Sequence, residues 1–144
     1  MTTGPGGSSD ALNADDVELR LPADSVYVAV LRTTAVGLAA RVDFTLDDIE
    51  DLRMAVGEAC ALVLPAAAPG GDLVARFGLF PGRLRVEVSV PAGAPVRPDQ
   101  DSFAWQVLTT LADDVTSYAA DDDRFTIALT MVSTLVATDP DVGA

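Results

Sequence analysis

The chain has 144 residues, of which 49% are hydrophobic, and its 22 acidic residues outnumber nine basic ones to give a formal net charge of −13. This length and composition predict one folded domain and exclude a chain that is disordered throughout. With no histidine and a single cysteine, an internal disulfide and a histidine-dependent catalytic triad are excluded, and no metal site is expected.

The excess of acidic residues indicates which partners the protein can bind, and the composition also predicts its location. A charge of −13 repels nucleic acid and anionic lipid and favours a basic protein partner, although the simpler reading is that acidity only aids solubility. We expect no apolar run long enough to cross a membrane and find no signal peptide. Together with the single cysteine, this predicts a cytoplasmic protein.

In chain order, residues 1–16 are rich in Gly, Ser and Asp and predict a disordered tail. The folded domain is expected over 17–136, followed by a polar tail over 137–144. The domain begins with alternating apolar and polar residues, which predict a strand from Val17 to Leu21.

A helix is then expected from Ser25 to about Ala40. Its sequence, SVYVAVLRTTAVGLAA, is apolar nearly all round, which predicts burial on more than one side. Arg32 is the only charge within it and is either a rim residue or a contact with a partner.

The longest predicted helix covers 45–64 and carries the motif GEAC. Thr45 is a suitable N-cap, with Asp48 three residues later in place of the usual Glu, and Pro65 ends the helix. Apolar residues recur at helical spacing and form one face. Glu58 lies nearly opposite that face, so its carboxylate is either solvated or aimed at something above the helix.

Two hairpins and a third helix complete the domain. Turn signals separate runs of β-forming residues, Pro-Gly in the first hairpin and Asp121-Asp122-Asp123 in the second. The order of helices and hairpins predicts an α+β two-layer sandwich, with one mostly antiparallel sheet and helices on one face. The remaining predicted elements are strands at Asp72–Phe80, Arg83–Val90, Val115–Ala119 and Phe125–Val132, and a helix at 103–112.

Four segments resemble the anti-sigma-factor serine kinases, an RsbW-like family with the histidine-kinase-like (GHKL or Bergerat) ATPase fold. They are LPADSVYVAVLR, DLRMAVGEACALVL, SFAWQVLTTLADDV and RFTIALTM, within 17–132. The third resembles the actinobacterial branch that restrains stress or sporulation sigma factors. The resemblance implies that Arg32 contacts a sigma factor, that Glu58 is the candidate catalytic base, and that a homodimer forms near the first strand and helix.

The nucleotide motifs of that family are degenerate in this chain. The family's Mg²⁺-binding Asn, four residues after the Glu, is replaced by Leu62, which offers no oxygen to a hard cation. The Asp that binds adenine falls on Val90 or Pro91, and neither side chain can accept that hydrogen bond.

The phosphate-facing Gly-x-Gly is replaced by Ser102-Phe103-Ala104, and the closing Gly-Thr by Arg124-Phe125. Gly93 and Thr126 remain as weak candidates for cofactor binding. We therefore expect no cofactor, with ATP and Mg²⁺ needed only if the chain is an active kinase.

Each candidate residue also has a purely structural explanation. Glu58 continues an acidic stripe, and Arg32 can be a solvated rim charge. Cys60 lies on the apolar face and is expected to be a small buried hydrophobe. Trp105 and Phe103 are expected in core or lid packing, or in the space that an adenine occupies in relatives.

Three functions remain open from the sequence. The first is an anti-sigma factor that sequesters a sigma factor by direct binding and is antagonised by a STAS-type anti-anti-sigma protein. The second is an ATP-dependent serine kinase that phosphorylates that antagonist. The third is a sigma-independent signalling adaptor on an inactive ATPase fold. The degenerate motifs favour the first, because phosphoryl transfer depends on positioning and charge stabilisation.

Overall fold

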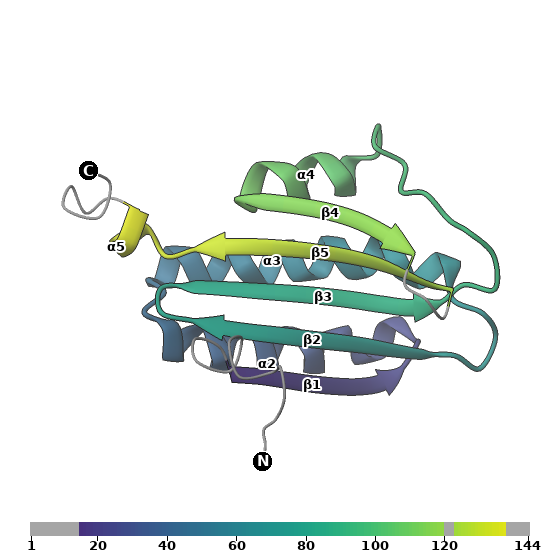
Figure 1. Cartoon of the computed structure of the whole chain (residues 1–144), viewed down its shortest axis with the longest axis horizontal. Coiled ribbons are helices and arrows are strands. Elements are labelled where there is room, and N and C mark those ends of the chain that lie inside the picture. The colour runs from purple at the N-terminus through teal and green to yellow at the C-terminus, as the bar shows by residue number, and fades with distance from the viewer. Residues whose placement is uncertain (1–14, 120–122, 138–144) are drawn as a thin grey trace, which may run out of the picture.

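A computed structural model describes residues 15–119 and 123–137 (Figure 1). Most of the two expected tails and of the turn at 121–123 therefore lies outside the described residues. In chain order the elements are β1 (Asp15–Pro22), η1 (Ser25–Tyr27), α2 (Val28–Ala39), η2 (Ala40–Val42), α3 (Leu46–Val63), η3 (Leu64–Ala66), β2 (Asp72–Phe80), β3 (Arg83–Pro91), α4 (Phe103–Leu111), β4 (Asp114–Ala119), β5 (Arg124–Val132) and α5 (Thr134–Ala137).

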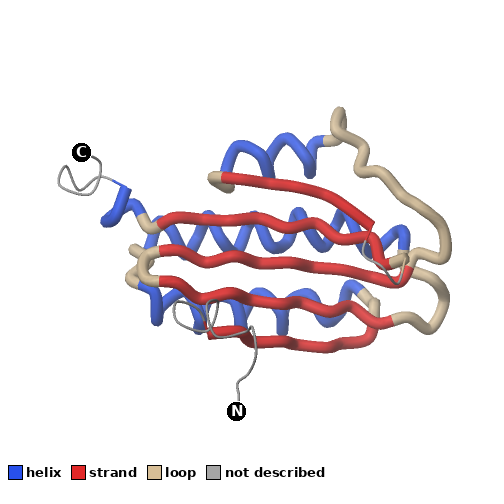
Figure 2. The backbone as a smooth tube through the Cα atoms, viewed as in Figure 1, coloured by secondary structure: helices blue, strands red, loops and turns tan. Residues whose placement is uncertain are grey.

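The five strands form one antiparallel sheet in the order β1-β2-β3-β5-β4 (Figure 2). The register pairs Val86 with both Phe77 and Leu129, so apolar side chains of adjacent strands point to the same face. Helices α2 and α3 cover this face, and α4 packs against α3 near the β4 edge. The predicted α+β two-layer fold is confirmed and is consistent with the histidine-kinase-like ATPase fold.

The predicted strands are confirmed with small changes at their ends. Strand β2 has the predicted bounds, and β3, β4 and β5 each gain one residue. Pro22 pairs with Asp72 as the last residue of β1, which an edge strand tolerates because its outer N–H groups have no partner strand. Helix α3 ends at Val63, and Pro65 lies in the following 3-10 turn. The short helix α5 was not predicted.

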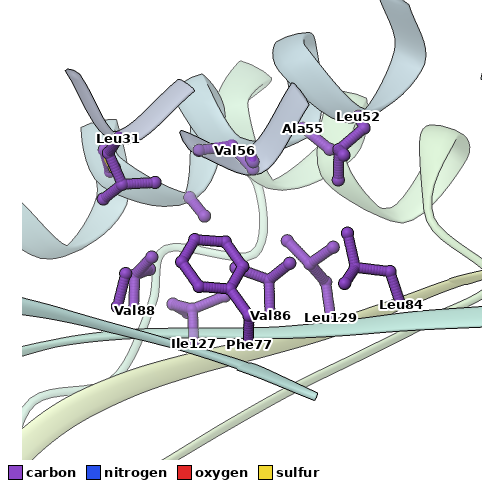
Figure 3. Close-up of a cluster of buried hydrophobic side chains, with 14 of the residues drawn as sticks. Leu31, Leu52, Ala55, Val56, Phe77, Leu84, Val86, Val88, Ile127 and Leu129 are labelled. Atoms are coloured by element: carbon purple, nitrogen blue, oxygen red, sulfur yellow. The ribbon is translucent and has the colours of Figure 1, made fainter. Parts of the chain in front are cut away.

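The hydrophobic core lies between the sheet and the helices (Figure 3). Phe77 of β2 points up from the sheet toward α2 and α3 and is 1% exposed. Burying a side chain such as Leu or Phe stabilises a fold by roughly 1.5–3 kcal/mol. The apolar stripe of α3 therefore holds the helix on the sheet. Residues of this stripe that are completely buried are Leu52, Ala55, Val56, Ala59 and Val63.

The N-terminus of α3 carries the predicted capping box. The backbone N–H of Asp48 donates to Thr45 Oγ1 at 3.1 Å, and the backbone N–H of Thr45 donates to Asp48 Oδ2 at 2.9 Å. Asp48 Oδ2 also accepts hydrogen bonds from the backbone N–H and the hydroxyl of Thr134, at 3.1 and 3.2 Å. This carboxylate therefore joins the start of α3 to α5.

Asp48 is 5% exposed. Burial opposes ionisation of its carboxyl group, but the hydrogen bonds from Thr45 and Thr134 lower its pKa below the ordinary value. A neighbouring contact reinforces the same junction, because Ser133 Oγ donates to the backbone carbonyl of Asp43 at 2.7 Å.

Helix α2 is less buried than its composition predicted. Its buried residues form a single stripe, whereas Val26 and Tyr27 of η1 and Val30 of α2 are 70%, 37% and 46% exposed. The prediction that α2 is buried on more than one side is therefore wrong for the single chain. The sheet and α3 cover one side of α2, and no layer of described residues covers the other. The stripe consists of Val28, Leu31, Ala35 and Ala39.

The expectation that the chain has no apolar segment long enough to span a membrane is also wrong, because Ser25–Val42 is such a segment. Its length and mean hydropathy of 1.3 suffice for a span, with 28% of the segment buried. The buried stripe of α2 belongs to the core of the domain, and core helices of globular domains share this composition. No other helix among the described residues is as long and apolar.

The face of the sheet away from the helices carries ion pairs. Arg124 donates to Asp72 Oδ1 at 2.8 Å and to Ser89 Oγ at 3.0 Å, and it also reaches both backbone carbonyls. Arg20 binds the same Asp72 carboxylate. The hydrogen bond from Arg124 is the main cause that lowers the pKa of Asp72, against the effect of burial. By strand alternation, the arginines on this face are Arg20, Arg76, Arg83, Arg85 and Arg124.

We predict that Asp48→Asn lowers the free energy of unfolding by about 1–3 kcal/mol at pH 7, because an amide offers one acceptor oxygen and no charge to these donors. Urea unfolding followed by tryptophan fluorescence measures this change in the free energy of unfolding. The folded pKa is below the unfolded one, so the contribution is present above the unfolded value, near pH 4, and disappears as the pH falls through the folded value.

The matched control is Asp47→Asn, on the same helical turn but exposed, which should cost about 0.5 kcal/mol or less. A difference between Asp48→Asn and the wild type that stayed constant down to pH 2 would contradict the assignment.

Candidate functional site

An open groove of about 250 Å³ lies between α2 and α3. Its walls bring together Arg32 of α2 and Glu58 of α3, two residues that the sequence singled out for different roles. The groove is lined by Arg32, Glu50, Arg53, Met54, Gly57 and Glu58.

The α3 side of the groove follows from helical spacing. Glu50, Met54, Gly57 and Glu58 recur every three or four residues and so share one stripe, away from the buried face. Met54 is 53% exposed and Glu58 is half-buried. Arg53 pairs with Glu50 at 3.2 Å, an exposed pair that contributes little to stability.

Arg32 is exposed, as expected, and its guanidinium lies against α3 at Gly57. Among the described residues it makes no ion pair, although acidic side chains line the same groove. The arrangement leaves a cationic group with donor N–H groups available to an incoming partner.

Cys60 is buried, as expected, at 1% exposure. Burial raises the pKa of its thiol to about 12, while the positive charge of Arg32 acts in the opposite direction. The thiol is therefore a small buried group with little thiolate character at neutral pH.

The positions that hold nucleotide in the resembled family are apolar here. Leu62 packs against the core, and Val90 and Phe125 belong to the core, at 0% and 2% exposure. These side chains offer no donor or acceptor to adenine or to Mg²⁺.

The segment Ser102-Phe103-Ala104, which replaces the glycine-rich loop of the resembled family, forms the N-terminus of α4. The Ser102 hydroxyl caps the helix by accepting from the backbone N–H of Trp105 at 3.2 Å, and the Ser102 N–H donates to the backbone carbonyl of Asp99. Trp105 packs against the core, one of the expected placements, whereas Phe103 is 77% exposed, which contradicts core packing but not a place in a lid. Phe103 is the first residue of α4, and its side chain lies largely in solvent.

The two weak cofactor candidates lie apart from this groove. Gly93 follows β3 with a φ of 72°, and a Cβ atom added to it would have nothing within 4 Å. Thr126 alternates with the core residue Phe125, which places it on the face of the sheet away from the helices, and its hydroxyl donates to the Arg124 carbonyl at 3.4 Å. The structure therefore does not bring Thr126 together with Glu58.

In the part of the chain that the structure describes, no group of three or more Cys, Asp or Glu side chains could hold a metal ion. A second open groove of about 260 Å³ runs along the outer side of α4, lined by Phe103, Gln106, Val107, Thr110 and Leu111.

Sequence reasoning missed Gly57 as a groove residue. The available signal was a glycine inside a long helix, where it costs about 1 kcal/mol relative to alanine. Its neighbour on the other wall, Arg32, could not be identified from α3 alone, because the crossing of α2 over α3 is a tertiary feature.

The chain is 42% identical over 80 residues to the serine-protein kinase RsbW of Bacillus subtilis (strain 168) and 41% identical over 80 residues to that of Bacillus velezensis, each match covering 54% of this chain and 50% of the relative. It is 38% identical over 77 residues to serine-protein kinase RsbW of Bacillus thuringiensis, covering 52% of this chain and 48% of the relative.

The chain thus spans about half the length of the curated relatives that it matches. No protein-family model matches it. The RsbW-like resemblance recognised in the sequence is confirmed by these relatives.

Proposed function

We propose that this protein is an anti-sigma factor that binds an RNA polymerase sigma factor directly and is released from it by a STAS-type anti-anti-sigma protein. The observation that carries the proposal is the exposed guanidinium of Arg32, which has no ion-pair partner among the described residues and lies in the groove between α2 and α3. The similarity to RsbW proteins supports the same assignment.

The distribution of charge supports a basic partner on the helical side. On the outer face of the sheet, four of the five arginines form ion pairs with Glu18, Asp72 or Glu87. Around α3, acidic residues outnumber basic ones, and Asp47, Glu50 and Asp51 on its first two turns are exposed or half-buried. Sigma factors carry basic DNA-binding surfaces, so this field would speed and orient the encounter.

The exposed apolar side of α2 supports the proposed homodimer. Val26, Tyr27 and Val30 expose apolar surface at the N-terminal end of this helix, and apolar groups that cluster on a surface commonly mark a protein contact. A cytoplasmic location, with no role for membrane or nucleic acid, accords with the net charge of −13.

Nucleotide is dispensable for the proposed sigma-factor binding. The metal-ligand position is Leu62, and the adenine position at the end of β3 is apolar. Losing one buried charge-assisted hydrogen bond costs about 1.5–3 kcal/mol, and losing a metal ligand has an effect of similar size. Two or three such losses together reduce affinity by several powers of ten.

A serine kinase is the second candidate function, and two observations favour it. The curated relatives are named serine-protein kinases, and Glu58 lines the same groove as Arg32. In this reading Glu58 would accept the proton of a serine hydroxyl on the antagonist. The apolar nucleotide positions weigh against it.

Co-expression tests the main proposal. Each sigma factor encoded in the same genome is produced with a tag beside this protein, and complexes are isolated by affinity and size-exclusion chromatography. We expect one sigma factor, or a small set, to form a stoichiometric complex without ATP and to lose transcription activity in a run-off assay. If every sigma factor elutes free of the protein, the anti-sigma proposal is wrong.

We predict that Arg32→Ala weakens binding of that sigma factor by about 2 kcal/mol or more, roughly 30-fold, because a desolvated Arg at an interface is a common hot spot. Isothermal titration calorimetry measures the affinity. The matched control is Arg41→Ala, an exposed arginine beyond the end of α2, which should bind as the wild type does. Equal affinities for Arg32→Ala and the wild type would make Arg32 a rim charge.

We predict that Glu58→Gln leaves sigma-factor binding unchanged and that calorimetry detects no binding of ATP with Mg²⁺ to the wild type. The reason is that Glu58 then has no nucleotide beside it on which to act. If label from ATP appears on a serine of the antagonist and Glu58→Gln abolishes that transfer, the protein is an active serine kinase and this prediction is wrong.

A further inference from the structure

The middle of α3 has a glycine where its neighbour across the groove comes unusually close. An ideal Cβ built on Gly57 would lie 2.9 Å from Arg32 Nη2, 3.0 Å from Nε and 3.3 Å from Cζ. Real Cβ atoms essentially never approach another atom to less than 3.0 Å. The guanidinium of Arg32 therefore occupies space that exists only because residue 57 has no side chain.

The helix itself does not require glycine at this position. Glycine in a helix interior is less favourable than alanine, and Gly57 lies within the regular α3 helix. Its neighbours Val56 and Ala59 face the core and are completely buried, whereas Gly57 is half-buried beside the groove. The core does not explain the residue, but the contact with Arg32 does.

We infer that Gly57 positions Arg32, by letting its guanidinium lie on the surface of α3 with its Nε and Nη2 atoms nearest the helix. The inference rests on the proposed function for its consequence, which is that a partner meets an arginine already held in the groove. A pre-placed side chain loses less conformational entropy on binding than one that moves freely in solvent.

The surroundings of Arg32 make this positioning necessary. No ion pair with a described residue fixes the guanidinium, and the side chain is exposed. Contact with the surface of α3 at Gly57 is therefore what holds it in the groove. The groove also contains Met54, so the position of the guanidinium sets the spacing between a cationic and an apolar contact.

Gly57→Ala separates this role from a role in folding. The atoms that the new methyl group would meet are the far end of a flexible side chain, so the guanidinium can move while both helices stay in place. Gly37→Ala is the matched control, because Gly37 is an exposed glycine within α2 that has nothing within 4 Å of its Cβ position. Both variants should unfold in urea at or above the wild-type midpoint.

The first experiment needs no partner. The ¹⁵N heteronuclear NOE of the Arg32 Nε–Hε group, assigned with Arg32→Ala, reports how far the side chain is held on the ps–ns timescale. In the wild type and in the control Gly37→Ala, we expect a higher value for Arg32 than for Arg41. In Gly57→Ala we expect the Arg32 value to fall to that of Arg41. An Arg32 signal that matches Arg41 in the wild type, or that Gly57→Ala does not change, overturns the inference.

The second experiment is a double-mutant cycle with the sigma factor retained in co-expression. We expect Gly57→Ala to weaken binding about 3- to 10-fold, which corresponds to one immobilised side chain, and to have no further effect in the Arg32→Ala background. A loss of affinity that persists without Arg32 overturns the inference. Failure of the wild type to bind any sigma factor counts against the proposed function alone, since the NOE measurement still decides whether Gly57 lets α3 restrain the Arg32 side chain.

Discussion

The packing of the apolar stripe of α3 across the sheet is the contact on which the remaining structure depends. Helices α2 and α4 both pack against α3, and Asp48 at its first turn holds α5. Because α3 turns its Leu52 and Val56 side chains to the sheet, the opposite stripe must face outward. The burial that stabilises the fold therefore also sets the direction in which the groove opens.

Local patterns were sufficient to predict most of the elements. Alternation in β3 and β5 and helical spacing in α3 agree with the fold because each pattern reports the one face that is buried. The capping box was readable because it involves residues three apart, Thr45 and Asp48. Helix α5 was not readable, since its attachment depends on a hydrogen bond between Asp48 and Thr134, which are distant in sequence.

The site was harder to predict than the fold, because it depends on tertiary neighbours. The sequence identified Arg32 and Glu58 separately, but only the crossing of α2 and α3 places them in one groove. Similarly, α2 is apolar nearly all round, so its composition could not show which side is covered. Val30 lies on the side that remains exposed. The sequence left Phe103 between core and lid packing, because an aromatic residue at the first position of a helix can point either toward the core or away from it.

The apolar nucleotide positions have a consequence for stability. A ligand that binds only the folded state stabilises that state by mass action. In this chain Val90 and Phe125 close that region with core contacts. These two side chains therefore contribute to the stability of the fold without a ligand.

The strand order bears on the way the chain folds as it is made. Strand β5 is the last of the described strands in sequence, yet it lies inside the sheet between β3 and β4. While the ribosome is still synthesising this segment, β3 has one unpaired edge and β4 lacks the strand with which it pairs. Exposed strand edges favour pairing with other chains. Nascent copies on one messenger are therefore open to mispairing until β5 leaves the exit tunnel, and a slow stretch of translation before β5 would lengthen that interval.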